Sequence, residues 1–190
     1  MRFEMAVSSF LVALPAMVSA TTLSASMTVD NTFAAYVSTS ATSVGAPFLS
    51  GANWPSTFVG STTLTPLVDN YLHVRATDQG RPEMFIGRFT LSDANFEFVN
   101  ATQTLHTVAS DWTVSHTGFG VTPVAPLDIG PNGMSPWGNF PAMTSNARFL
   151  WHPTYQSTVY FTATIRALVV PEPTVLGLLA GTGLMMLRRR

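Results

Sequence analysis

The chain has 190 residues, of which 46% are hydrophobic and only 10% are charged, and its formal net charge is −1. This length is typical of one domain, and the high hydrophobic share with low net charge excludes an intrinsically disordered protein. The chain has no cysteine, which excludes disulfides, thiolate metal sites and thiol catalysis. It has no lysine either, and its few arginines cannot form the basic face that a nucleic-acid partner requires.

Residues 1–20 predict a secretory signal peptide. Arg2 precedes an apolar run from Met5 to Met17, and the small residues that a signal peptidase requires follow, ending at Ala20. The alternative is a buried N-terminal helix, which Pro15 within the run disfavours. We therefore expect a signal helix, export of the chain and cleavage after Ala20.

Residues 21–168 are predicted to form an all-β domain, because apolar and polar residues alternate there with a period of two. Such alternation gives each strand of an antiparallel sheet one core face and one solvent face. Many short strands between Gly, Pro, Asn and Asp turns indicate a two-sheet sandwich. The alternating apolar positions are Leu23, Ala25, Met27 and Val29; Phe33, Ala35 and Val37; Leu72, Val74 and Ala76; Phe85, Gly87, Phe89 and Leu91; Phe96 and Phe98; Trp112 and Val114; Ala147, Phe149 and Trp151; and Val159, Phe161, Ala163 and Ile165.

This domain resembles the galactose-binding-like jelly roll of many secreted bacterial proteins. The matching positions are Asp30, Asn31, Phe33, Tyr36, Trp54, Asn70, Leu72, Val74, Ala76 and Gly80, with closing strands in 147–165. The resemblance implies a jelly-roll-like sandwich over most of residues 23–168; an immunoglobulin-like sandwich is the alternative. The chain departs from the family at Ser38-Thr39, where Asn-Gly is usual, and at Asp69, where a turn glycine is usual. A family ligand site is therefore not carried over.

Motifs for catalysis are missing from the sequence. The histidines have no metal-ligand spacing, and neither G-x-S-x-G nor S-x-x-K occurs. Carboxylates for glycoside hydrolysis could be chosen from Asp78, Glu83, Asp93 and Glu97, but sequence does not set the separation that this chemistry needs. We expect no enzymatic activity, and an extracellular hydrolase is the least supported reading. His73, beside Arg75 on the outward face of its strand, is expected to be solvated.

Two kinds of ligand contact remain open. Turn residues with side-chain oxygens could hold a structural Ca²⁺, although such residues also form turns by bonding their own backbone, which we favour. The candidates are Asp30, Asn31, Asp69, Asn70 and Asp78. Trp54, and Trp137 in the long Pro/Gly-rich loop from Gly118 to Thr144, are candidate glycan contacts, because an aromatic ring can stack on a sugar. The alternative, which we favour, is that these rings pack within their loops. Trp112 and Trp151 lie on strand patterns and are expected in the core.

Residues 169–190 carry the most specific pattern. Pro171-Glu172-Pro173 is followed by an apolar run from Thr174 to Leu187 and by Arg188, Arg189 and Arg190. As a helix, the run would rise about 21 Å, short of the roughly 30 Å hydrocarbon core, so it would be a marginal membrane helix. The arginines favour the cytoplasmic side.

This order of motif, short apolar helix and arginine cluster resembles the PEP-CTERM sorting signal of Gram-negative bacteria. The resemblance implies processing near the PEP motif by an exosortase, a membrane-embedded cysteine protease-transpeptidase, and a link to exopolysaccharide and biofilm. We therefore expect an exported, non-enzymatic protein of the cell envelope, outer surface or extracellular matrix, held for a time in the membrane. The alternative is a carbohydrate-binding module that acts directly on a glycan such as the exopolysaccharide.

Overall fold

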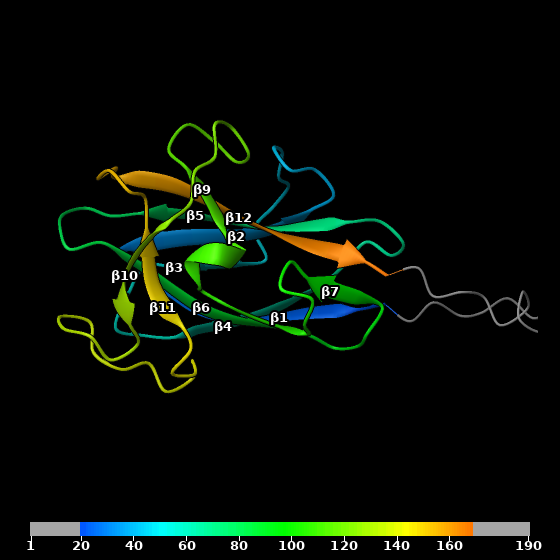
Figure 1. Ribbon diagram of the computed structural model, residues 1–190, viewed down its shortest axis with the longest axis horizontal. Helices are drawn as coiled ribbons and strands as arrows, with labels where there is room; N and C mark the ends of the chain where they lie inside the picture. The colour runs from blue at the N-terminus through cyan, green and yellow to red at the C-terminus, as the bar shows by residue number, and fades with distance from the viewer. Residues whose placement is uncertain (1–19, 169–190) are drawn as a thin grey trace, which may run out of the picture. The chain divides into compact units, whose positions relative to one another are not determined.

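The computed structural model describes residues 20–168, which fold as an all-β sandwich of two antiparallel sheets, as predicted (Figure 1). Sheet A has the strand order β10-β11-β6-β1-β4, and β8 also pairs with β6. Its strands are β1 Thr22–Asp30, β4 Phe58–Thr63, β6 Met84–Leu91, β8 Thr104–His106, β10 Leu127–Pro131 and β11 Arg148–Trp151.

Sheet B has the strand order β3-β2-β5-β12-β7, and β9 also pairs with β12. Its strands are β2 Thr32–Ser38, β3 Leu49–Gly51, β5 Asn70–Thr77, β7 Phe96–Phe98, β9 Thr113–Ser115 and β12 Thr158–Ala167. The one helical element within residues 20–168 is a 3-10 turn, η1 Ala109–Asp111, and none of the described helices could cross a membrane. The predicted signal and C-terminal membrane helices lie outside the described residues.

The chain begins and ends its described course at one end of the sandwich, here called the proximal end. There Thr22 at the start of β1 accepts the N–H of Ser92, and Leu168 just after β12 donates to the carbonyl of Asn95. The opposite, distal end holds the end of β1 and the end of β5, joined by the 2.8 Å bond from the Asn31 N–H to the Thr77 carbonyl.

The core between the sheets follows the predicted alternation except around β11, where Ala147 and Phe149, predicted to face inward with Trp151, lie in a separate cluster. Leu23, Ala25, Met27 and Val29 of β1 all face it, and none is more than 1% exposed. The registers of β1 with β6 and of β5 with β12 set their inward residues opposite one another in the sheets. Aromatic rings fill the centre: those of Phe85, Phe89, Trp112, Trp151 and Phe161. The predicted core positions of Trp112 and Trp151 are thereby confirmed.

One-sided alternation predicted a polar outer face for sheet A, but part of that face is apolar and buried. Met84 and Ile86 of β6 point away from the main core and yet are fully buried, together with Phe149 of β11. The segment after β10, in the predicted Gly118–Thr144 loop, covers them with Trp137, Phe140 and Met143. This long loop therefore contains strand β10 and then a segment that packs over β6 and β11. We call the resulting second apolar cluster the outer A cluster; its members include Met84, Ile86, Trp137, Phe140, Met143 and Phe149.

The outer face of sheet B is covered as well, and this corrects the expectation for His73. The ring of Phe119 lies 4.6 Å from that of His73 and 5.8 Å from that of Tyr36, and His73 is fully buried. His73 Nδ1 is bonded to Thr162 Oγ1, and its Nε2 to the Ser40 carbonyl. The alternation placed His73 correctly on the outward face, but a loop covers that face. Burial lowers the pKa of His73 below its ordinary value, against the bond to the Ser40 carbonyl, which raises it.

The lowered pKa of His73 predicts a loss of stability in acid. The unfolded chain takes up a proton as the pH falls through 6.5, whereas the folded chain takes it up only at lower pH, so acid favours unfolding. We expect the free energy of unfolding to decrease from pH 7 toward pH 5, and less steeply in His73→Gln than in wild type. Urea unfolding across this range measures it. Equal slopes in both proteins would contradict the assignment to His73.

Candidate functional site

The main polar cluster at the distal end is built on two buried carboxylates. Asp30 ends β1 and is 7% exposed, and Asp78 follows β5 and is 2% exposed. Asn31 lies beside them: its Nδ2 donates to Asp30 Oδ1 at 2.6 Å, and its Oδ1 accepts the N–H of Gln79 at 2.6 Å. The antiparallel order brings these residues together, because β1 and β5 both end here. The positions of Asp30 and Asp78 in the sequence did not predict that they lie close together.

Each carboxylate of the distal cluster has neutral donors. Trp137 Nε1 donates to Asp30 Oδ2 at 3.1 Å, and the Tyr155 hydroxyl donates to Asp78 Oδ2 at 3.0 Å. The Gly80 N–H also donates to Asp78 Oδ2, whereas the buried Oδ1 of Asp78 has no partner among the described residues. The guanidinium of Arg81 lies 4.6 Å from the centre of the Tyr155 ring, a cation–π contact.

The electrostatics of the distal cluster follow from burial and proximity. Burial raises the pKa of Asp30 above its usual value; the bond from Trp137 lowers it, and the charge of Asp78 raises it again. The pKa of the Tyr155 hydroxyl is raised, first because its proton is donated to Asp78. Within residues 20–168, hydrogen-bond donors contact both carboxylates, and neither forms an ion pair.

The residues proposed for calcium do not come together as a set. Asp30, Asn31 and Asp78 meet at the distal end, but Asp69 and Asn70 lie at the proximal end, where Asn70 holds its own loop and Asp69 binds the end of β12. The donors at Asp30 and Asp78 occupy acceptor positions, and calcium needs six to eight oxygens. Within residues 20–168, no group of three or more His, Asp or Glu side chains could hold a metal ion. Asp78 and Asn70 bond to nearby backbone as turn residues do, whereas Asp30, Asn31 and Asp69 bond to groups elsewhere in the fold.

The two candidate glycan contacts are packed. Trp137 is only 7% exposed and its ring centre lies 4.9 Å from that of Phe149, so its ring is packed in the domain, as the favoured alternative predicted. Trp54 packs partly buried against the same outer A cluster, and its carbonyl accepts the Thr28 hydroxyl. Met84 and Ile86 on the outer face of β6 provide the apolar surface against which Trp137 packs.

We expect Trp137→Phe to lower the free energy of unfolding by about 1–2 kcal/mol at pH 7, because the variant deprives a buried carboxylate of a donor. Without that donor the pKa of Asp30 rises further, so Asp30 becomes protonated more readily in acid. The decrease in the free energy of unfolding should therefore be smaller at pH 4, where a protonated Asp30 no longer needs the donor. Urea unfolding at both pH values tests this.

The matched control is Trp151→Phe, because its indole donates to the uncharged carbonyl of Gln156 at 3.1 Å. The decrease in the free energy of unfolding caused by Trp151→Phe should be the same at both pH values. If Trp137→Phe also shows no pH dependence, its bond does not stabilise the charged form of Asp30.

The other predicted chemical groups are dispersed. Of the carboxylates considered for hydrolysis, Asp78 and Glu83 lie toward the distal end, and Asp93 and Glu97 lie toward the proximal end. His116 and His152 do approach each other, with ring centres 5.2 Å apart. Ala20, the predicted cleavage residue, is exposed just before β1, whereas Pro171, Glu172, Pro173 and Arg188 to Arg190 lie outside the described residues. Tyr155 and Arg81 were not foreseen, and no sequence pattern marks them.

Comparisons of the chain with protein-family profiles, with curated proteins and with solved structures find no match.

Proposed function

We propose that this chain is an exported, non-enzymatic surface or matrix protein that an exosortase processes at its C-terminal sorting signal. One observation carries the proposal: Pro171-Glu172-Pro173, an apolar run and three terminal arginines follow one another in the order of a PEP-CTERM signal. The protein would be held in the membrane by this segment until processing. It would then be displayed or released among exopolysaccharide at the outside of a Gram-negative cell.

The position of the motif relative to the last strand supports this proposal. β12 ends at Ala167, and Leu168 makes a backbone bond to Asn95. Pro171 follows shortly after in the sequence, so a protease acting there would meet the chain immediately outside the sheets. Cleavage at this point would leave every described strand intact.

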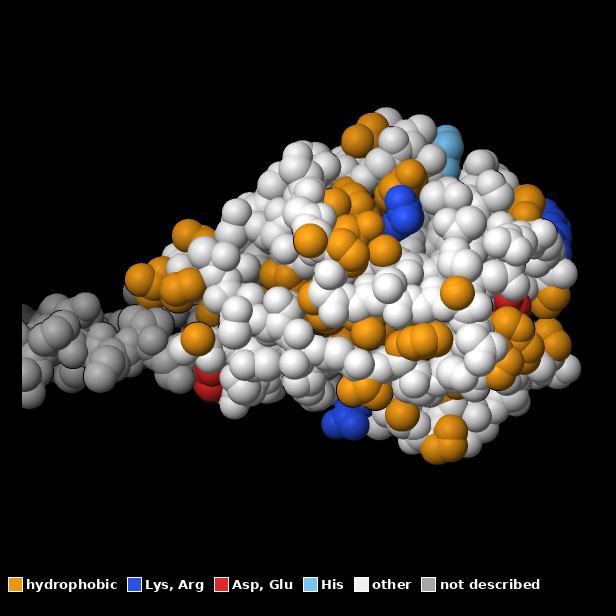
Figure 2. All heavy atoms as spheres, turned by 180° about the vertical axis from the view of Figure 1, so that it is seen from behind, with side chains coloured by type: hydrophobic (Ala, Val, Ile, Leu, Met, Phe, Trp, Pro, Cys, Tyr) orange, Lys and Arg blue, Asp and Glu red, His pale blue; other side chains and the backbone are white. Residues whose placement is uncertain are grey.

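The surface of the domain also suits a hydrated extracellular setting. Ser and Thr together make up about a fifth of the chain, 17 Ser and 25 Thr, and charged residues only a tenth. Figure 2 shows a largely uncharged face with few acidic or basic side chains. The packing of Trp54 and Trp137 favours this structural role over a carbohydrate-binding module that stacks sugars on those rings.

We further propose that the sandwich is jelly-roll-like. The chain passes back and forth between the sheets: β1, β4, β6, β8, β10 and β11 lie in sheet A, and β2, β3, β5, β7, β9 and β12 lie in sheet B. Such crossing is typical of Greek-key and jelly-roll sandwiches, whereas an up-and-down meander keeps sequential strands together. The predicted helices at the two ends, a signal helix and a short membrane helix, complete the proposed architecture.

Replacing Glu172 by Ala, or deleting Arg188 to Arg190, is expected to stop maturation. In the producing cell, full-length protein should accumulate in the membrane fraction, because the processing enzyme no longer recognises the segment or the segment no longer holds its orientation. Immunoblots of membrane, surface and medium fractions measure this.

Arg166→Gln is the matched control, since it removes a basic residue from β12 and leaves the sorting segment unchanged. It should mature like wild type, and all variants should retain a β-rich far-UV circular dichroism spectrum. If the Glu172 and arginine variants also mature and localise normally, the sorting proposal is wrong.

A further inference from the structure

The proximal end of the sandwich carries exposed apolar side chains. Leu67 is 75% exposed, Val68 44% and Leu168 36%, and we call these three residues the proximal patch. Pro66 precedes them in the loop between β4 and β5 and is exposed as well. Figure 2 shows hydrophobic side chains at this end of the domain, as on other parts of the same face. Exposed consecutive apolar residues in a loop are unusual in a soluble surface and mark contact sites.

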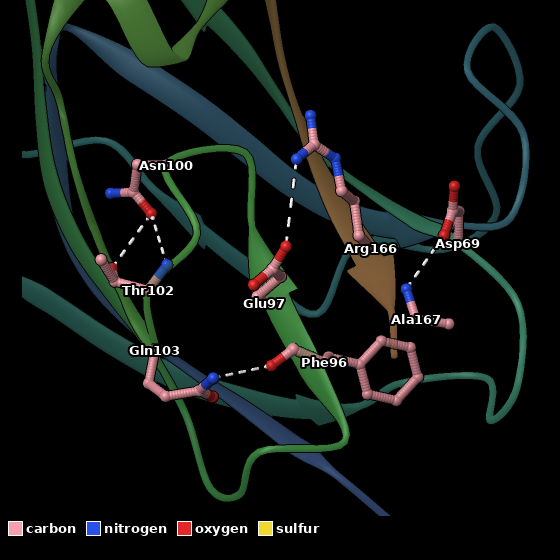
Figure 3. Close-up of polar contacts among 8 residues, drawn as sticks. All are labelled: Asp69, Phe96, Glu97, Asn100, Thr102, Gln103, Arg166 and Ala167. Carbon is pink, nitrogen blue, oxygen red and sulfur yellow. Dashed lines mark hydrogen bonds and ion pairs between the residues drawn. The ribbon is translucent and has the colours of Figure 1, made fainter. Parts of the chain in front are cut away.

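Hydrogen bonds hold the proximal patch together. Asp69 Oδ1 accepts the N–H of Ala167 at 2.9 Å, which ties the loop to the end of β12 (Figure 3). Val68 and Leu168 are the chain neighbours of this bonded pair. On the other side, Asn70 donates to the carbonyls of Thr65 and Val68, which fixes the loop from within. The patch is therefore a defined surface of the fold.

The length of chain after the patch indicates what covers it. Five residues, 169–173, separate Leu168 from Thr174, the first residue of the predicted membrane segment. The six Cα-to-Cα steps from Leu168 to Thr174 span at most about 20 Å when fully extended. In a chain held in the bilayer by that segment, the length of this connection keeps the proximal end within about 20 Å of the point where the chain enters the lipid.

We propose that the proximal patch contacts the lipid surface while the chain is held in the membrane. This inference rests on the proposed function, since it needs the C-terminal segment to enter the bilayer. The contact is apolar rather than electrostatic. The charged residues at this end are Asp69, Asp93, Glu97 and Arg166, an excess of acids, and Arg166 is engaged with Glu97 at 3.9 Å (Figure 3). Anionic lipid should therefore weaken the contact.

The absence of cysteine from the chain permits a direct test. Full-length Leu67→Cys, labelled with a polarity-sensitive fluorophore, is reconstituted into phosphatidylcholine vesicles that contain nitroxide-labelled lipid. Leu127→Cys is the matched control: Leu127 is 47% exposed and pairs with Trp151 toward the distal end. We expect severalfold stronger quenching at position 67 than at position 127, and less quenching when phosphatidylglycerol is added.

Flotation of the vesicles separates the two proposals. If the protein floats with the vesicles but position 67 is quenched no more than position 127, the patch does not contact lipid and this inference fails alone. A label at position 67 that is shielded without lipid and is not quenched in vesicles would show that residues 169–173 cover the patch, which overturns lipid contact. Failure to float at all overturns the membrane segment and the inference with it.

Discussion

Trp151→Ala is expected to lower the free energy of unfolding by about 3–5 kcal/mol, the cost of emptying a large buried aromatic site. Trp151 is fully buried in the main core, its ring centre lies 6.2 Å from that of Phe161, and its indole donates to the Gln156 carbonyl. The substitution removes the packing and the hydrogen bond together. Since small domains are stable by only about 5–15 kcal/mol, this loss is a large fraction of the total.

Urea unfolding followed by far-UV circular dichroism measures the loss. Trp54→Ala is the control of the same chemistry, because Trp54 is only partly buried at the edge of the outer A cluster. Its cost should be clearly smaller. If the two substitutions cost the same, the core between the sheets is not the main source of stability.

Asn70→Ala is expected to cost about 2–4 kcal/mol, because it removes three hydrogen bonds that a fully buried side chain makes to the loop, each worth about 1 kcal/mol. Asn70 is fully buried at the start of β5. Its Oδ1 accepts the Thr65 N–H at 3.0 Å, and its Nδ2 donates to the carbonyls of Thr65 and Val68. Alanine satisfies none of these groups, so the loop between β4 and β5 loses its internal support.

The comparison for Asn70 is Asn53→Ala, which removes one bond to Ser56 in an exposed turn and should cost less than about 0.5 kcal/mol. Equilibrium unfolding gives both values. Amide hydrogen exchange should also show faster exchange at Thr65 in Asn70→Ala. Unchanged protection at Thr65 would mean that the loop is held by its backbone and not by the Asn70 amide.

Much of the main core could be predicted because alternation is a local property. In β1, β5 and β12, every apolar residue named from the period of two faces the space between the sheets. The class of fold followed from the same signal, because strands with one apolar face have to pair and pack in layers. The core places of Trp112 and Trp151 followed as well.

The outer faces could not be predicted in this way. Met84, Ile86 and Tyr36 sit at positions that alternation assigns to solvent, and His73 was expected to be solvated there. Each is buried because a segment distant in sequence lies over it: Trp137 and its neighbours over sheet A, and Phe119 over sheet B. The alternation period of a strand predicts which face a side chain lies on, but it does not predict which distant segment packs over that face.

By itself, the amino-acid sequence determined the two-sheet, all-β class and the inward residues of the main strands, because these depend on neighbours within a few residues. The sorting signal is also proposed from sequence, since its order of motif, apolar run and arginines is read along the chain. Only the tertiary structure decided that Asp30 meets Asp78, that Trp137 is packed, and that Leu67 and Leu168 share the proximal end. These are long-range contacts, which depend on strand order, and strand order is set by the packing of the whole domain.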